Sequence, residues 1–313
     1  MNTIEKLVDK LAQEIDDQWQ DGVVDDTASD TLSNHPAPED KPKTVVRPGQ
    51  WTGRANLASK KFDLDFIRLK ERGFVTPDTT HSKLLEELRV VKRRLLASCF
   101  EPESEFEGDP RLIMVTSAAP GEGKTFLAIN LALSLATEID RSVLLVDTDT
   151  VKGDVMRLLG VNSERGLTDV LASDELDIRD ALVATNAERL TLLPAGPMRS
   201  NATELFSSEK MVRLISDLSR CYPDRLVIFD TPPLLAATEA HVLATLVGQV
   251  VLVVEAQRTT QAHLAEALEQ LADSRAKVSL LLNKSHDKDE TEYYYGQYKG
   301  REGCENRAPT KAK

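Results

Sequence analysis

Apolar and polar positions form a regular block pattern across residues 81–284. Stretches with apolar residues at helical spacing, such as 124–137, 208–220 and 260–275, separate short runs that are almost wholly apolar. The apolar runs read RLIMVTSA, RSVLLVD, LTLLPAG, RLVIFD, QVVLVVEA and KVSLLLNK. Strands that alternate with helices favour a parallel sheet covered on both faces. The pattern predicts a doubly wound α/β domain with its active site at the carboxyl ends of the strands.

The regions on either side of this domain are polar. Within residues 1–18, apolar residues recur at helical spacing and predict one amphipathic helix. Residues 19–80 are rich in Asp, Ser, Thr and Pro, which predicts a mostly disordered linker. Residues 285–313 are predicted to be a flexible tail. Four of the five tyrosines lie in this tail: Tyr293, Tyr294, Tyr295 and Tyr298.

Composition narrows the class of protein. The 313 residues carry a formal net charge of −12, which disfavours nonspecific binding to nucleic acid. The three cysteines are scattered, which predicts neither a disulfide framework nor a zinc site. The N-terminus lacks the pattern of an export signal, and the uncharged stretch AHVLATLVGQVVLVV is shorter than the ~20 residues that span a bilayer. We therefore expect a cytoplasmic protein without a transmembrane helix.

The stretch SAAPGEGKTF joins the first predicted strand of the domain to a helix. Gly121 and Gly123 allow backbone N–H groups to turn toward phosphate oxygens, Lys124 neutralises phosphate charge, and the Thr125 hydroxyl suits Mg²⁺. Ala118 stands where the usual motif begins with glycine. The predicted nucleotide contacts in this stretch are Pro120, Gly121, Glu122, Gly123, Lys124, Thr125 and Phe126.

Carboxylates follow two further predicted strands. VLLVDTD ends in Asp147 and Asp149, and LVIFDTPP contains Asp230. Acids at strand ends beside a phosphate loop are suited to hold Mg²⁺ for phosphoryl transfer.

The motifs APGEGKT, LLVDTD and VIFDTPP, followed by a tyrosine-rich tail, resemble those of the bacterial tyrosine kinases, which use modified Walker A, A′ and B motifs. EELRVVKRRLL resembles the assembly helix of that family, with Glu86 and Arg89 in place and Lys92 where a second arginine is usual. IEKLVDKL, DTDTVKGDVMRLLG and GLTDVL further resemble the exosortase-associated autokinases of exopolysaccharide gene clusters. Many members of that family carry arginine at the position of Val151, where only the adjacent Lys152 could replace it here.

The resemblance implies a P-loop domain of the MinD/ParA type that binds ATP and Mg²⁺. The implied catalytic residues are Lys124, Asp147, Asp149 and Asp230; the implied metal ligands are Thr125, Asp147 and Asp230; and Asn283 is implied to face the adenine. A phenol has a pKa near 10 and needs a base at neutral pH, so a carboxylate should accept its proton. Asp149 is our choice, although the residues leave the assignment between Asp147 and Asp149 open.

The same resemblance implies a biological setting. We expect phosphorylation of Tyr293, Tyr294, Tyr295 and Tyr298, by transfer between neighbouring subunits. A ring-like homo-oligomer of the dephosphorylated protein would form through Glu86, Arg89 and Lys92. Partners would be a separate transmembrane copolymerase, which activates the kinase and recruits it to the inner membrane, and a tyrosine phosphatase. The expected role is regulation of exopolysaccharide synthesis and export.

Two other functions share these motifs. A MinD/ParA-like ATPase switch would phosphorylate nothing, but its signature lysine is replaced here by Ala119. A nucleotide-gated partner of a polysaccharide copolymerase would use the tyrosines only for docking. Phosphotyrosine formed by the purified protein with ATP separates the kinase from both.

Overall fold

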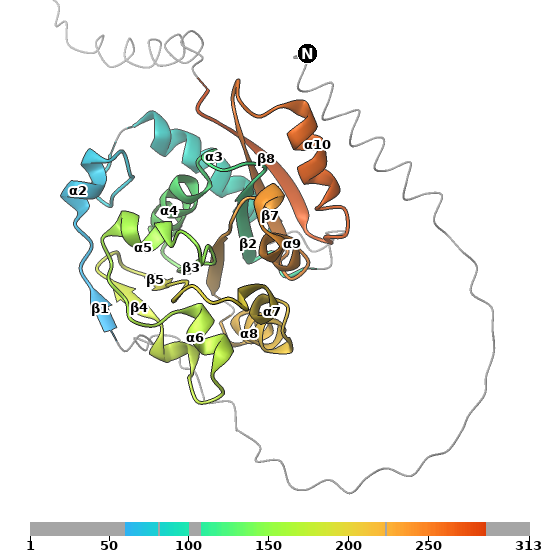
Figure 1. The fold of residues 1–313 in the computed structure, drawn as a ribbon. Helices are drawn as coiled ribbons and strands as arrows, with labels where there is room; N and C mark the ends of the chain where they lie inside the picture. Colours follow the sequence, from blue (N-terminus) through green and yellow to red (C-terminus); the bar gives the residue numbers. More distant parts are fainter. Residues whose placement is uncertain (1–59, 81, 100–107, 223, 286–313) are drawn as a thin grey trace, which may run out of the picture. The chain divides into compact units, whose positions relative to one another are not determined.

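A computed structural model describes residues 60–80, 82–99, 108–222 and 224–285 (Figure 1). The predicted helix in residues 1–18, the linker up to residue 59 and the tail tyrosines lie outside the described residues. The described part is built on one sheet flanked by helices, which confirms the predicted α/β class.

The sheet has eight strands in the order β1-β4-β5-β3-β6-β2-β7-β8. All neighbouring strands run parallel except β4 and β5. The strands are β1 Lys60–Phe62, β2 Leu112–Ser117, β3 Ser142–Asp147, β4 Val183–Thr185, β5 Leu190–Leu193, β6 Arg225–Asp230, β7 Gln249–Glu255 and β8 Lys277–Asn283. The six predicted apolar runs form β2, β3, β5, β6, β7 and β8, because strands buried on both faces need unbroken apolar sequence.

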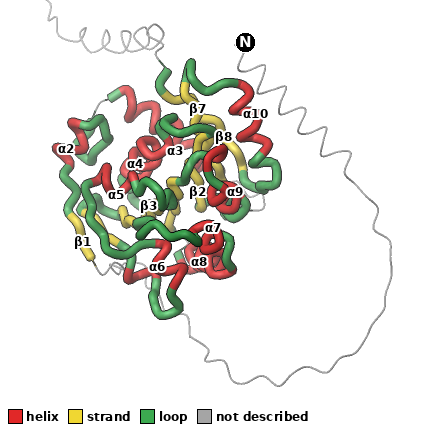
Figure 2. Tube along the Cα trace, in the orientation of Figure 1, coloured by secondary structure: helices red, strands yellow, loops and turns green. Residues whose placement is uncertain are grey.

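Helices cover both faces of the sheet (Figures 1 and 2). They are α2 Phe66–Glu71, α3 Lys83–Ser98, α4 Lys124–Leu135, α5 Asp154–Leu159, α6 Leu167–Ala172, α7 Ala202–Phe206, α8 Glu209–Cys221, α9 Thr238–Ala244 and α10 Gln261–Glu269, with short 3₁₀ turns η1 Ile178–Asp180 and η2 Leu234–Ala236. Side-chain caps begin several of them: Ser82, Ser208 and Thr260 each accept a hydrogen bond from an N–H in the first turn of α3, α8 and α10.

Two hydrophobic cores lie on opposite faces of the sheet. In β2, Ile113 and Val115 belong to the core shared with α3, α4 and α5, whereas Leu112 and Met114 belong to the core shared with α6, α8, α9 and α10. This alternation follows from the period-two geometry of a strand. The arrangement confirms a doubly wound sheet and holds the carboxyl ends of β2, β3 and β6 side by side.

The structured part begins earlier than the sequence pattern predicts. Residues 60–80 were assigned to the linker, yet β1 pairs with β4, and Leu64, Leu69 and Phe74 are buried. Backbone N–H groups of this segment also find distant acceptors: that of Leu64 donates to the Asn186 side chain at 2.8 Å, and that of Val75 to Asn130 at 2.7 Å. The predicted domain boundary at residue 81 is therefore too late. The reason is that this segment is short and rich in charged residues, so its few apolar residues become buried only through contacts with the rest of the domain.

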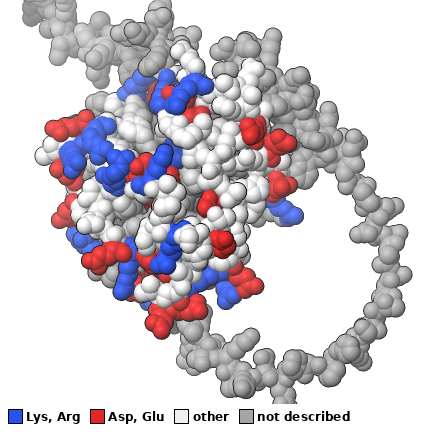
Figure 3. Space-filling view, in the orientation of Figure 1, with Lys and Arg blue, Asp and Glu red and all other residues white. Residues whose placement is uncertain are grey.

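Among the described helices, none is long and apolar enough to cross a membrane. On the face drawn in Figure 3, basic and acidic side chains are interspersed, so no large surface of one sign is seen there.

Candidate active site

The phosphate loop connects β2 to α4 and requires its glycines. Gly121 and Gly123 have φ angles of 87° and 99°, in the left-handed region that side chains disfavour. Gly123 is the N-cap of α4, and no side chain caps this helix end. The first N–H groups of α4 are therefore available to an anionic ligand.

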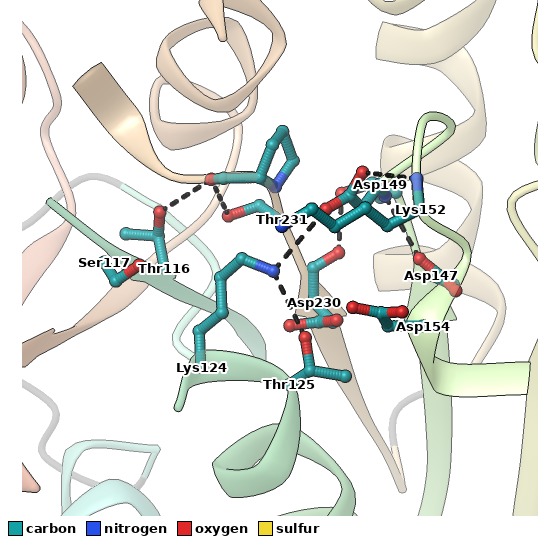
Figure 4. A network of polar contacts seen from close by, with 12 residues as sticks. Thr116, Ser117, Lys124, Thr125, Asp147, Asp149, Lys152, Asp154, Asp230 and Thr231 are labelled. Atoms are coloured by element: carbon teal, nitrogen blue, oxygen red, sulfur yellow. Dashed lines mark hydrogen bonds and ion pairs between the residues drawn. The ribbon is translucent and has the colours of Figure 1, made fainter. Parts of the chain in front are cut away.

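Lys124 points from the start of α4 toward the carboxylates (Figure 4). Its ammonium donates to the Thr125 hydroxyl at 3.1 Å and lies 3.6 Å from Asp149 Oδ2. The Lys124 side chain is buried, so this ion pair is weakly screened by water. Lys124, Thr125 and Asp149 thus meet at one point.

Asp147 and Asp230 end adjacent strands at the same register. Asp147 accepts hydrogen bonds from the N–H of Asp149 at 3.1 Å and of Val155 at 3.3 Å. Burial raises the pKa of Asp147 well above its usual value, and the charge of Asp230 raises it further. These two carboxylates cannot both be charged at low cost unless a cation lies with them.

Asp230 is a fully buried carboxylate, and neither of its oxygens has a hydrogen-bond partner among the described residues. Burial raises the pKa of Asp230 to about 7, although the nearby Lys124 ammonium and Thr125 hydroxyl oppose the shift; the Thr125 hydroxyl lies near the carboxylate without meeting the geometry of a hydrogen bond. A buried, unpaired carboxylate is unusual and fits a site that is completed by a bound cation. Within the described residues, no three His, Cys, Asp or Glu side chains are grouped closely enough to hold a metal alone. Nucleotide sites usually hold Mg²⁺ by one or two carboxylates and by phosphate oxygens.

The loop after β3 presents Asp149. Its Oδ1 accepts the N–H of Lys152 at 3.0 Å, and its carbonyl accepts the N–H of Gly153 at 2.8 Å. The Val151 side chain in this loop is exposed, and the next residue, Lys152, is the one whose N–H binds Asp149. Backbone N–H groups of the loop thus hold Asp149 in place, and its Oδ2 faces Lys124.

Sequence reasoning missed several hydroxyl groups that secure the strand ends. Thr148 Oγ1 donates to the carbonyl of Asp230 at 2.7 Å, and Thr116 Oγ1 donates to that of Pro232 at 3.0 Å. Thr231 Oγ1 donates back to Val115 at 3.2 Å. The available signal was a threonine directly beside each strand end, although threonine is common enough there to pass unnoticed.

The remaining predicted nucleotide contacts differ in burial and in the residues that they contact. Pro120 is exposed at the loop, and Glu122 is buried. The centroid of the Phe126 ring lies 4.9 Å from that of the Phe74 ring, against the hydrophobic core. Only the backbone of Phe126 is therefore free to contact a phosphate. The Asn283 amide donates to the carbonyl of Glu122 at 2.8 Å, and its oxygen accepts the N–H of Lys284 at 2.9 Å.

The predicted assembly residues lie on α3. Glu86 and Arg89 form an ion pair within the helix and remain partly exposed. Lys92 is instead bound inside the domain, where its ammonium lies 2.6 Å from Glu138. Lys92 therefore links α3 to the end of α4 within one subunit, and not to a neighbouring subunit.

Comparison with known proteins agrees with this geometry. The family model of an AAA domain matches residues 110–285. The tyrosine-protein kinase YwqD of Bacillus subtilis is 37% identical over 186 residues, which cover 59% of this chain and 77% of YwqD. The putative tyrosine-protein kinase EpsB of Ralstonia nicotianae is 34% identical over 61% of this chain, but only 25% of EpsB is covered. The solved VpsO kinase domain superposes with a TM-score of 0.52 at 30% identity, over 65% of this chain and all of that domain.

A P-loop fold with three carboxylates around the phosphate loop defines the class of P-loop nucleotide-binding proteins. Within that class, the chain belongs to the bacterial tyrosine-protein kinases. It is therefore a protein-tyrosine kinase.

Proposed function

We propose that this kinase transfers the γ-phosphate of ATP to the tyrosines of its own C-terminal tail: Tyr293, Tyr294, Tyr295 and Tyr298. The observation that carries the proposal is the buried Asp230 carboxylate without a partner among the described residues, next to Asp147 and the Lys124–Asp149 ion pair. These residues supply carboxylates suited to Mg²⁺ and an ammonium suited to a phosphate group.

Each residue has a separate task in the proposed reaction. The N–H groups of the phosphate loop and Lys124 bind and orient the triphosphate. Thr125, Asp147 and Asp230 would hold Mg²⁺, which supplies positive charge to the phosphate oxygens. Asp149 accepts the phenolic proton as the tyrosine oxygen bonds to the γ-phosphorus and the bond to ADP breaks.

The tail can reach a site. Its first tyrosine follows Lys284, the residue after β8, by nine positions. An extended chain of that length spans about 30 Å, which suffices to enter a neighbouring subunit. The remaining tyrosine, Tyr222, precedes β6 and so lies at the opposite edge of the sheet from the carboxylates. Burial raises the pKa of Tyr222 to about 12, which makes it a poor acceptor.

The proposed setting is the control of exopolysaccharide synthesis at the inner membrane. A separate transmembrane copolymerase would recruit and activate the kinase, and a tyrosine phosphatase would reset it. The dephosphorylated protein would assemble into a ring through the exposed Glu86–Arg89 pair of α3. The family membership supports the kinase, and the likeness to exopolysaccharide autokinases supports the setting.

Intact mass spectrometry after incubation with ATP and Mg²⁺ tests the reaction. Wild-type protein should gain phosphates, whereas Lys124→Met should gain none because the triphosphate loses its main counter-ion. Changing the four tail tyrosines to Phe should also remove the label while ATP binding persists, and Tyr222→Phe is the matched control. Full labelling of Lys124→Met, or label that stays in the tail variant, would refute the proposal.

A further inference from the structure

Glu122 is an unexpected residue for a phosphate loop. Its carboxylate is 1% exposed and stands between Gly121 and Gly123, where a negative charge would repel a triphosphate. Both carboxylate oxygens are, however, held by the chain. Oε2 accepts the N–H of Ala119 at 2.9 Å, and Oε1 accepts the Thr259 hydroxyl. Glu122 therefore joins the loop to a second segment.

That second segment is the turn after β7. The hydroxyl of Thr259 accepts the N–H of Glu255 at 2.9 Å, and the N–H of Thr259 donates to the Glu255 carbonyl at 3.1 Å. These two hydrogen bonds join Thr259 to Glu255 and stabilise the turn between them. Glu122 is thus bound to a hydrogen-bonded turn at the carboxyl end of the sheet.

The end of β8 holds the same loop through its carbonyl groups. The Asn283 amide donates to the carbonyl of Glu122 and the Lys284 ammonium to that of Gly121, each at 2.8 Å. Lys284 is itself held by Glu255 at 3.0 Å. The packing is close, because a Cβ added to Gly123 would lie 2.1 Å from Asn283 Nδ2. We call Glu122, Thr259, Asn283 and Lys284 the outer brace.

The outer brace has a direct consequence for phosphate binding. All peptide bonds among the described residues are trans, and in a trans peptide the carbonyl and the next N–H point in opposite directions. Holding the carbonyls of Gly121 and Glu122 toward β8 turns the N–H groups of Glu122 and Gly123 away from it. Those are N–H groups that the loop needs for phosphate oxygens.

We propose that the four residues of the outer brace are positioning residues, which preorganise the phosphate loop for a triphosphate. Asn283 acts on the loop backbone and does not read the adenine. The inference deepens the proposed function and rests on its assignment of the loop to phosphate binding. It also accounts for an acid in the loop, because Glu122 contributes through its contacts with Ala119 and Thr259 and leaves the phosphates to the backbone.

Calorimetric titration with ATP, GTP and inorganic tripolyphosphate, each with Mg²⁺, tests the inference. Asn283→Asp, Thr259→Val and Lys284→Met each remove one donor of the outer brace. Each should weaken binding by about tenfold, the worth of one hydrogen bond, and by the same factor for all three ligands. Lys284→Arg should restore most of the affinity. Thr245→Val, at the exposed end of α9, is the matched control and should bind as wild type does.

The two interpretations of Asn283, a contact with adenine or a contact with the loop backbone, predict different affinities of Asn283→Asp for the three ligands. If Asn283 reads adenine, Asn283→Asp weakens ATP alone and leaves tripolyphosphate unchanged, which overturns the inference. Unchanged affinities in Thr259→Val and Lys284→Met also overturn it, and the partly exposed Lys284 makes its variants decisive if Asn283→Asp does not fold. Wild-type protein that fails to bind ATP would instead refute the proposed function.

Discussion

At the scale of one residue, ionisation of the buried Asp230 carboxylate lowers the stability of the folded protein. This carboxylate has a pKa of about 7 in the folded protein, against 3.8 for an ordinary aspartate. Between these values the folded state holds a proton that the unfolded state has lost. Stability therefore falls as pH rises from 3.8 to about 7, and the loss is complete above that pH. A bound cation would remove this cost, because it would interact with the charged form.

Because the Asp230 carboxylate lowers stability as pH rises, its replacement in Asp230→Asn should stabilise the protein most at high pH. Without nucleotide and with a chelator present, the substitution should raise the melting temperature at pH 8 by several degrees, and much less at pH 5. The reason is that wild-type protein carries the buried charge only at the higher pH. Thermal unfolding at both pH values measures the difference. Asp217→Asn, on the helix α8 away from the site, is a matched control, and an equal shift at both pH values would contradict the explanation.

At the scale of elements, the segment before α3 adds an edge to the sheet. Its four buried hydrophobic residues, Leu64, Leu69, Phe74 and Val75, all belong to the core that also packs β2 and α4. Phe74 lies against Phe126, two residues after Lys124. The segment thus supports the helix that begins at the phosphate loop, although it contributes no polar group to the site.

We predict that a chain beginning at Ser82 is strongly destabilised. Burying each side chain is worth about 1.5–3 kcal/mol, so the loss of all four sets an upper limit of about 6–12 kcal/mol on the destabilisation, and part of the α4 surface also becomes exposed. A chain that begins at Ser59 keeps all of these contacts and is the control. Urea unfolding of the two chains measures the difference. Equal midpoints would mean that the segment is an accessory to the fold.

At the scale of the whole molecule, phosphorylation would change the charge of the protein substantially. Four phosphotyrosines would add about −6 to −8 to a chain whose formal net charge is −12. In the proposed transfer between subunits, an unmodified tail would lie beside Asp147, Asp149 and Asp230 of a neighbour. A phosphorylated tail would meet those carboxylates with like charge and should leave.

We therefore predict that phosphorylation dissociates the oligomer. Sedimentation velocity should show a large species for dephosphorylated protein and for Lys124→Met, and a small species for fully phosphorylated protein. Glu86→Ala with Arg89→Ala should be small in either state. The exposed pair on α8, changed as Glu209→Ala with Arg213→Ala, is the control for loss of a surface ion pair. Equal sizes of the phosphorylated and dephosphorylated forms would refute the switch and leave the kinase chemistry intact.

The sequence alone determined the features that depend on local chemistry. Six strands follow from unbroken apolar runs, and the loop conformation follows from Gly121 and Gly123, because only glycine adopts such angles freely. The carboxylates could be foreseen at one edge because parallel strands end together. The tertiary structure alone decided that β1 and β4, of three residues each, join the sheet, since so short a strand has no pattern of its own. It also decided that Glu122 meets Thr259, 137 positions away, and that Asp230 is left without a partner among the described residues. Such contacts depend on how distant segments pack together, which no local pattern of residues encodes.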